Sequence, residues 1–267
     1  MTSSVYSAVN SFPVSVRMPD SYPIPWNILP GLAVAAFGRR QRSFRKDSQS
    51  ATSLLKPPLV IRGLENVPAT GPYLLTTNHY GRPGFGAWWL IMALSAALPV
   101  EVHWIMTGAW IFPGKIYEAP MRSFSSWLFP RLAGVYGFTN MTPIAPYSTD
   151  VAGRAQGVRR TLDYARSTPN PVIGLAPEGK NHPGGVLGAP PPGLGRFVAK
   201  LAPLCQVILP AGVFEAGDNL CVQFGEPYRL ETPSGLSAEQ IEAQVSSTVM
   251  HAIARQLPPA LRGKFNH

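Results

Sequence analysis

Two short apolar runs, each followed at once by polar residues and glycine, constrain the fold of this 267-residue chain most strongly. The first run, 72–77, leads into Asn78-His79, and the second, 171–175, leads into a loop that begins at Ala176. Short apolar runs between turn signals are typical of strands buried on both faces. Such strands occur in parallel sheets, so we expect both polar ends to lie at the carboxyl edge of one sheet.

The remainder of the chain alternates between strand-like and helix-like patterns. Strands are expected at 59–62, 73–77, 100–106, 171–175, 206–213 and 220–224, and helices at 85–98, 151–165, 194–201 and from 237 onward. The last helix opens with a capping box, Ser237 and Gln240. The helix at 151–165 carries a predicted apolar stripe of Val151, Ala155, Val158, Leu162 and Ala165. The alternation predicts an α/β fold with a mainly parallel central sheet flanked by helices.

His79 is the first candidate for chemistry. It follows the strand at 73–77 and precedes the glycine-rich turn 80–86, where a substrate can approach the backbone closely. A histidine in this position can act as a general base. The alternative is a purely structural histidine. The second loop, Ala176–Lys180, adds weight to the catalytic interpretation because it also lies at a strand end.

Three segments resemble the glycerolipid acyltransferase family. They are the approach 60–79 to Asn78-His79, the tripeptide Pro177-Glu178-Gly179, and the segment 207–213; the resemblance covers roughly 59 to 230. This family transfers a fatty acyl group from a CoA or carrier-protein thioester to a hydroxyl of a lysophospholipid or glycerol phosphate. The resemblance implies a glycerolipid acyltransferase-like fold, His79 as general base, an acyl thioester donor, and no metal or prosthetic group.

The chain departs from the family pattern at three places. Gly84 stands where the family has an aspartate that orients the histidine, and the stretch 134–141 lacks the arginine of the second motif. After Pro-Glu-Gly the family continues with Thr-Arg, whereas this chain has Lys180-Asn181. Lysine binds phosphate as a point charge and lacks the arginine fork. These departures leave open a different acceptor, other residues in these roles, or lost catalysis.

The resemblance also implies a set of substrate-binding residues. Glu178 is expected to hydrogen-bond substrate hydroxyls or to fix its loop, and the alternative is a cap on the turn or helix that follows. Arg82 is expected to contact a phosphate of CoA or of the acceptor, the alternative being a solvated loop charge. The predicted substrate contacts are Asn78, Arg82, Pro177, Glu178, Gly179 and Lys180. The loop 183–195 is expected to cover the substrate, and the aromatic segment 121–132 to line an acyl tunnel or join the core.

The first 50 residues are predicted to form an N-terminal extension to a domain at 51–267. Residues 1–25 are expected to be disordered or to form a loose strap. The apolar stretch 26–37 and the five cations within 39–46 fit an interfacial anchor on anionic lipid. The alternative is a surface helix packed on the domain with a solvated, charged tail. The first interpretation predicts a cytoplasmic protein bound peripherally at the inner face of the membrane.

The formal charge of +9 indicates an anionic partner such as lipid headgroups, CoA phosphates or nucleic acid. No nucleic-acid-binding motif accompanies it, so nucleic acid is not an expected partner. Cys205 and Cys221 each lie in an apolar run and are expected to be reduced core residues of a cytosolic protein. Two functions remain: an acyltransferase, or an inactive relative that still binds lipid or acyl chains.

Overall fold

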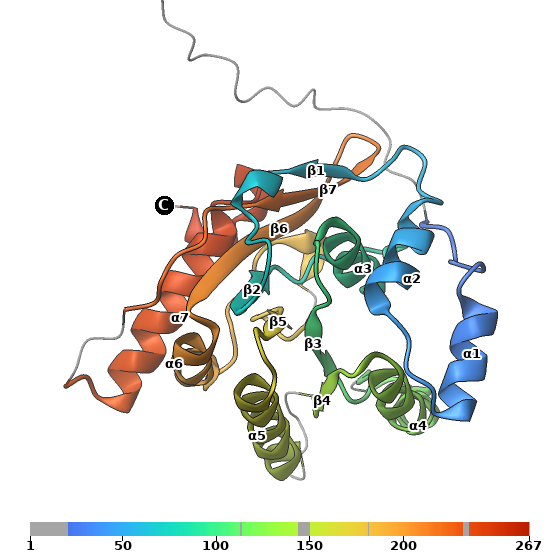
Figure 1. The fold of residues 1–267 in the computed structure, drawn as a ribbon, viewed down its shortest axis with the longest axis horizontal. Coiled ribbons are helices and arrows are strands. Elements are labelled where there is room, and N and C mark those ends of the chain that lie inside the picture. Colours follow the sequence, from blue (N-terminus) through green and yellow to red (C-terminus); the bar gives the residue numbers. More distant parts are fainter. Residues whose placement is uncertain (1–20, 113, 144–149, 181, 232–234, 267) are drawn as a thin grey trace, which may run out of the picture.

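The computed structural model describes residues 21–112, 114–143, 150–180, 182–231 and 235–266, which contain one seven-stranded sheet. The strand order is β1-β7-β6-β2-β5-β3-β4 (Figure 1). The strands are β1 (Val60–Arg62), β2 (Tyr73–Thr77), β3 (His103–Thr107), β4 (Thr139–Met141), β5 (Val172–Leu175), β6 (Val207–Ala216) and β7 (Asn219–Phe224). Only the β6–β7 pairing is antiparallel among these strands. The predicted α/β fold with a mainly parallel sheet is confirmed.

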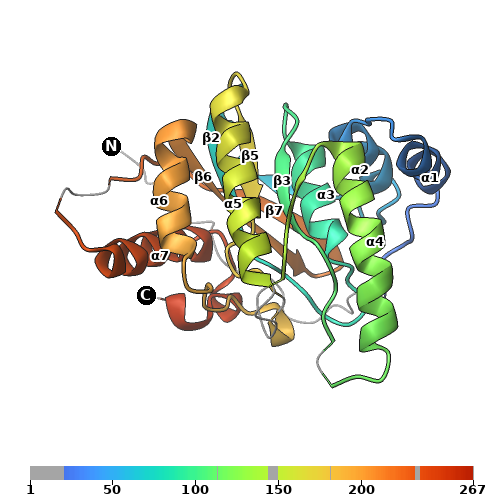
Figure 2. The same cartoon turned by 90° about the horizontal axis from the view of Figure 1, so that it is seen from below.

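Helices cover both faces of the sheet (Figures 1 and 2). They are α1 (Leu29–Gly38), α2 (Phe44–Thr52), α3 (Trp88–Ala97), α4 (Glu118–Tyr136), α5 (Asp150–Ser167), α6 (Leu194–Cys205) and α7 (Ala238–Ala254), with short 3-10 turns at Leu64–Asn66, Pro183–Gly185, Pro259–Leu261 and Gly263–Phe265. Strand β2 divides the core: Tyr73 and Leu75 pack with α2 and α3, and Leu74 packs with α5, α6 and α7. Burial on both faces explains why β2 is a continuous apolar run.

The strands that position the predicted site lie where the sequence places them. Strand β2 has the predicted bounds, and β5 lacks only the first residue of its predicted run. Helix α7 begins with the predicted capping box, in which the Ser237 hydroxyl accepts from the Gln240 amide. Strand β4 was not predicted. It has only three residues, Thr139–Met141, and two of them are polar, so no apolar run marks it.

The predicted apolar stripe of α5 is wrong over its first half. Val151 is 57% exposed and Ala155 is also exposed, whereas Leu162 and Ala165 are buried as expected. Gly157 faces the sheet in place of an apolar side chain, because a Cβ there would lie 3.2 Å from the Asn140 carbonyl oxygen. The backbone of α5 approaches β4 too closely for a larger residue.

The aromatic segment predicted at 121–132 forms the middle of α4. Phe129 joins the core, but Phe124 and Trp127 are 50% and 43% exposed. The core interpretation is therefore wrong for these two rings. The acyl-tunnel interpretation stays a prediction.

The N-terminal segment is more closely tied to the domain than its composition indicates. Helix α2 crosses the predicted domain boundary at residue 50 and packs on α3, with Phe44 and Ala51 in the core. Two of the five cations predicted to face anionic lipid or solvent are engaged within the protein: Arg42 pairs with the buried Asp47, and Arg45 donates to the Leu98 carbonyl. Disorder or a loose strap was predicted for residues 1–25, and residues 1–20 of this segment lie outside the described part of the chain.

No helix in the described ranges is both long enough and apolar enough to cross a membrane. Cys205 and Cys221 are buried and free, as predicted. Burial raises the pKa of the Cys205 thiol to about 12, so this cysteine is a core side chain rather than a nucleophile.

His103 is a buried histidine on β3 whose role is structural. Its Nε2 lies 2.8 Å from the Thr139 hydroxyl, and its ring stacks on Tyr164 with 3.7 Å between centroids. Burial lowers the pKa of His103 to about 4. The side chain is therefore neutral in the folded protein at physiological pH and joins β4 to β3 beside α5.

We expect this histidine to make the fold sensitive to acid. Between pH 6.5 and 4 the unfolded chain binds a proton at His103 and the folded chain does not, so stability falls as the pH falls. The loss is about 3 kcal/mol over this window. Urea unfolding of the native protein and of His103→Gln at several pH values checks this, since the variant should lose that part of the pH dependence. Equal pH dependence in both proteins would contradict it.

Candidate active site

The two predicted loops meet at the carboxyl edge of neighbouring parallel strands. Strand β2 pairs with β5 on one side and with β6 on the other. His79 follows β2, and Pro177-Glu178-Gly179 follows β5. The fold thus brings together residues that are about a hundred positions apart in the sequence.

Asn78 fixes the end of β2 against β6. Its side-chain nitrogen donates to the Val213 carbonyl, and its side-chain oxygen accepts from the Val213 amide, both at 2.8 Å. The side chain is 1% exposed. Asn78 therefore continues the sheet pairing by one step beyond the last backbone pair, Thr77 with Ala211.

Glu178 holds the backbone at His79. One carboxylate oxygen accepts from the His79 amide and the other from the Gly188 amide, each at 2.6 Å. Glu178 is 1% exposed, and burial raises its pKa to about 6 in spite of these two hydrogen bonds. Of its predicted roles, the geometry matches the one that fixes the loop, because the carboxylate joins β2 to the loop 183–195.

His182 lies next to this carboxylate but is not ion-paired with it. Its Nε2 is 3.8 Å from Glu178, beyond hydrogen-bond distance. Burial and the nearby charge of Lys180 both lower the pKa of His182. We therefore treat His182 as a neutral ring packed under Gly188, where an added Cβ would lie 2.0 Å from its Nε2.

The residues around Glu178 form a tight turn in which the Gly179 amide donates to the Ala176 carbonyl at 3.1 Å. Pro177 presets the first corner and Gly179 adopts φ +64°, a left-handed conformation that suits glycine. Pro177 is buried, whereas Gly179 and Lys180 are exposed. Of the residues predicted in this loop, these last two are the ones that solvent or a substrate can reach.

Arg82 binds a buried carboxylate. Its Nε and one Nη donate to the two oxygens of Glu215 at 2.6 and 2.7 Å, and the other Nη donates to the Pro83 carbonyl. Burial tends to raise the pKa of Glu215, but hydrogen bonds from Arg82, Tyr80 and Tyr22 keep it below its usual value. A substrate phosphate would have to compete with this bidentate pair for Arg82.

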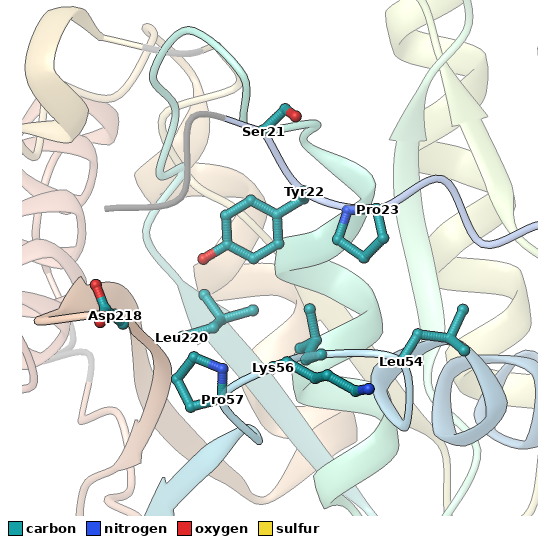
Figure 3. A pocket seen from close by; sticks show the side chains of 9 residues that line it. Ser21, Tyr22, Pro23, Leu54, Lys56, Pro57, Asp218 and Leu220 are labelled. Carbon is teal, nitrogen blue, oxygen red and sulfur yellow. The ribbon is translucent and has the colours of Figure 1, made fainter. Parts of the chain in front are cut away.

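Tyr22 attaches the N-terminal segment to the loop that follows His79. Its hydroxyl donates to Glu215 at 2.8 Å, and its backbone amide donates to the Gly84 carbonyl at 3.2 Å. Its ring meets Phe85 edge-on at 5.0 Å. Figure 3 shows Tyr22 on one side of a cavity of about 210 Å³, with Lys56 and Asp218 on the other.

The backbone conformation at position 84 favours glycine over aspartate. Gly84 has φ +81°, a left-handed conformation that disfavours any residue with a Cβ. In this chain the loop is held by Glu215, whose carboxylate accepts hydrogen bonds from Tyr80, Arg82 and Tyr22. Sequence reasoning missed Glu215 and Tyr22, since Glu215 lies two residues beyond the predicted strand 206–213 and nothing nearby marks it.

No group of three or more histidine, cysteine, aspartate or glutamate residues that could hold a metal ion occurs in the described part of the chain. The two carboxylates near the strand ends, Glu178 and Glu215, are buried and engaged within the protein, which leaves His79 as the candidate acid-base group among the predicted site residues.

Comparison with known proteins gives likenesses of fold among solved structures. No family model and no curated protein matches the sequence. The fold is similar to the crystal structure of the 1-acyl-sn-glycerophosphate (LPA) acyltransferase PlsC from Thermotoga maritima, with a TM-score of 0.49 and 14% sequence identity. The likeness covers 85% of this chain and 87% of that chain.

We expect that an aspartate at position 84 would destabilise the loop. Gly84→Asp and Gly84→Ala should each lower the free energy of unfolding by about 1–2 kcal/mol, because both place a Cβ at a left-handed φ. Urea unfolding measures this loss, and the alanine variant separates the backbone effect from that of the charge. An aspartate variant as stable as the native protein would show that the glycine conformation is not what excludes the carboxylate.

Proposed function

We propose that this protein is a divergent glycerolipid acyltransferase in which His79 is the general base. The observation that carries the proposal is the bond between the His79 amide and the Glu178 carboxylate, at 2.6 Å. It joins the Asn-His and Pro-Glu-Gly segments, on which the family resemblance rests, into one site at the carboxyl edge of the sheet. Ligands bind at this edge in open α/β sheets.

In the proposed reaction a substrate hydroxyl attacks the carbonyl carbon of an acyl thioester. His79 takes the hydroxyl proton as the new C–O bond forms, and the carbonyl electrons move to its oxygen. When the carbonyl re-forms, the C–S bond breaks and the thiolate leaves with the proton from the imidazolium. The products are an ester and a free thiol, and the histidine is neutral again without any cofactor.

Apart from Arg82, which is paired with Glu215, the other predicted site residues divide into two groups. Asn78, Pro177 and Glu178 are buried, so we assign them to positioning His79 and its loop. Gly179 and Lys180 are exposed beside them and are proposed to contact the acceptor, where the Lys180 ammonium suits an anionic headgroup. The proposed donor is acyl-CoA or acyl-carrier protein, and the acceptor a lysophospholipid or related glycerolipid.

An inactive lipid- or acyl-binding relative is the second candidate. The left-handed Gly84 favours it, because the loop then has no carboxylate at the position that orients the histidine in the family. Loss of such an orienting group lowers the rate by about 10⁴ in another histidine-based enzyme. Turnover distinguishes the two candidates directly.

The test is thiol release from a panel of acyl-CoA and acyl-carrier donors, with and without lysolipid and polyol acceptors. We expect acceptor-dependent release that falls by a factor of about 10² to 10⁴ in His79→Ala, because the hydroxyl then loses its base. His251→Ala is the control, since His251 lies on α7, where its ring contacts Ser247 of the same helix and Phe265. Release that does not depend on His79, or no release with any donor, would overturn the proposal.

We propose further that the protein binds peripherally to the inner face of the membrane, from the cytoplasm. A group of exposed aromatic side chains on α1 and α4 supports this. Phe37 is 74% exposed, and the centre of its ring lies 6.2 Å from that of Trp127. The ring centre of Phe124 lies 6.3 Å from that of Trp127. The Arg131 guanidinium lies 4.2 Å from the Trp127 ring centre. Aromatic rings beside a cation suit the headgroup region of an anionic bilayer.

Loss of the two central rings should weaken vesicle binding. We expect Phe37→Ser combined with Trp127→Ser to reduce binding to anionic phospholipid vesicles by at least about tenfold, since each buried ring contributes roughly 1.5–3 kcal/mol. Sedimentation with vesicles measures it, and Val151→Ser on α5 is the matched control at an exposed apolar residue. Equal binding by both variants would place the membrane contact elsewhere.

A further inference from the structure

The chain at His79 and Tyr80 is held from two directions. On one side the His79 amide donates to Glu178 at 2.6 Å. On the other side the Tyr80 hydroxyl donates to Glu215 at 2.7 Å, and Tyr80 is only 4% exposed. Glu178 follows β5 and Glu215 lies on β6, the two strands that flank β2. The backbone that carries the imidazole is therefore attached to both neighbours of its own strand.

The loop 183–195 joins these two attachments. The Gly188 amide donates to the second oxygen of Glu178. Three residues earlier, Gly185 lies so close to Tyr80 that an added Cβ would be 2.4 Å from the tyrosine ring. The same loop thus contacts the carboxylate that holds His79 and the side chain that follows His79. These contacts form a closed ring around the proposed base.

Arg82 and Tyr22 fix the carboxylate that holds Tyr80. Arg82 donates to both oxygens of Glu215 at 2.6 and 2.7 Å, and the Tyr22 hydroxyl donates to one of them at 2.8 Å. The rings of Tyr80 and Tyr22 each meet Phe85 edge-on, with 5.2 and 5.0 Å between ring centres. A bidentate arginine adds geometric specificity to a charge-assisted contact, so it fixes the orientation of the carboxylate.

We propose that Glu215, together with Arg82 and Tyr22, is a positioning group for His79 during acyl transfer and replaces the orienting aspartate for which Gly84 stands. The inference rests on the proposed reaction at His79. Glu215 and Tyr22 lie outside the three segments that resemble the family. Arg82 then acts through the carboxylate and not on a substrate phosphate, which is a different role from the one that its place in the loop predicted.

The kinetic effect of such a group differs from that of a substrate ligand. The imidazole must lie within hydrogen-bond distance of the attacking hydroxyl to take its proton. A displacement of about 1 Å can lower the rate by roughly a hundredfold. This loss appears in kcat, because substrate binding does not require the imidazole in one exact place. Loss of a contact to a substrate phosphate would instead raise KM.

The test compares the transferase kinetics of the full-length native protein with those of Glu215→Gln, Arg82→Gln and Tyr22→Phe. We expect kcat to fall by about 10- to 100-fold in the first two variants, with KM for donor and acceptor changed by less than about twofold. Tyr22→Phe keeps the ring beside Phe85 and removes one hydrogen bond, so kcat should fall by about two- to tenfold. A raised KM at unchanged kcat in Arg82→Gln would make Arg82 a substrate ligand and overturn the proposal.

Combined and conservative variants show whether these side chains act as one unit. The loss of kcat in Glu215→Gln combined with Tyr22→Phe should be smaller than the product of the two single losses, because both changes weaken the same contact. Arg82→Lys keeps the charge beside Glu215 and should retain more of kcat than Arg82→Gln does. Losses that multiply would show independent effects and contradict the proposal.

A second carboxylate with the same kinds of partner provides the matched control. Asp47 on α2 accepts from the Arg42 guanidinium at 2.8 Å and from the Tyr136 hydroxyl at 2.9 Å. Tyr136 ends α4 just before β4 begins, so this group lies at the amino edge of the sheet, opposite the site. Asp47→Asn should leave kcat within about twofold, with urea unfolding confirming that each variant is folded. An equal fall of kcat in Asp47→Asn and Glu215→Gln would mean a general loss of stability and overturn the proposal.

Amide hydrogen exchange separates failure of this inference from failure of the proposed function. In Glu215→Gln we expect exchange within residues 79–86 to be at least about tenfold faster, while exchange in β3 stays unchanged. Faster exchange in this variant, with no transferase activity in the native protein, would support the hold of Glu215 on His79 and reject the reaction. Transferase activity with the same kcat in the native and Glu215→Gln proteins would support the reaction and reject the positioning role.

Discussion

The candidate site depends on one buried carboxylate. Glu178 accepts hydrogen bonds from the backbone amides of His79 and Gly188. A single side chain therefore positions both the end of β2 and the loop 183–195. The pKa of Glu178 is raised to about 6, because burial destabilises the charged carboxylate more than the two hydrogen bonds stabilise it. Asn78 acts on the opposite side of β2 through the backbone of Val213. The main chain at His79 is therefore held by a carboxylate on one side of β2, and the neighbouring Asn78 is held by the backbone of β6 on the other.

A second carboxylate organises the loop beyond His79. Glu215 accepts hydrogen bonds from two tyrosine hydroxyls and from a bidentate arginine. It thereby joins three segments that are far apart in the sequence. The charge of Arg82 is neutralised in this way, whereas Lys180 is exposed in the turn that follows β5.

The sequence predicted features that repeat over several residues or have a fixed local spacing. Strand β2, buried on both faces, appears as an unbroken apolar run, and the capping box of α7 is a four-residue pattern. It did not predict β4, which has no apolar run, or the side of α5 that faces the sheet in the first half of the helix, where Gly157 stands in place of an apolar side chain. It missed Glu215 because the partners of that residue lie 133, 135 and 193 positions away, and no local pattern encodes such distances.

The strand order also determines when the sheet can form during synthesis. Strand β2 lies between β5 and β6, and β1 pairs with β7, so the two strands made first find partners only after residues 172 to 224 have left the ribosome. Until then the apolar run 73–77 has no neighbouring strand. Long separations of this kind slow folding and leave hydrophobic segments exposed to aggregation. A chain built this way should depend on holding chaperones more than one whose neighbouring strands are consecutive.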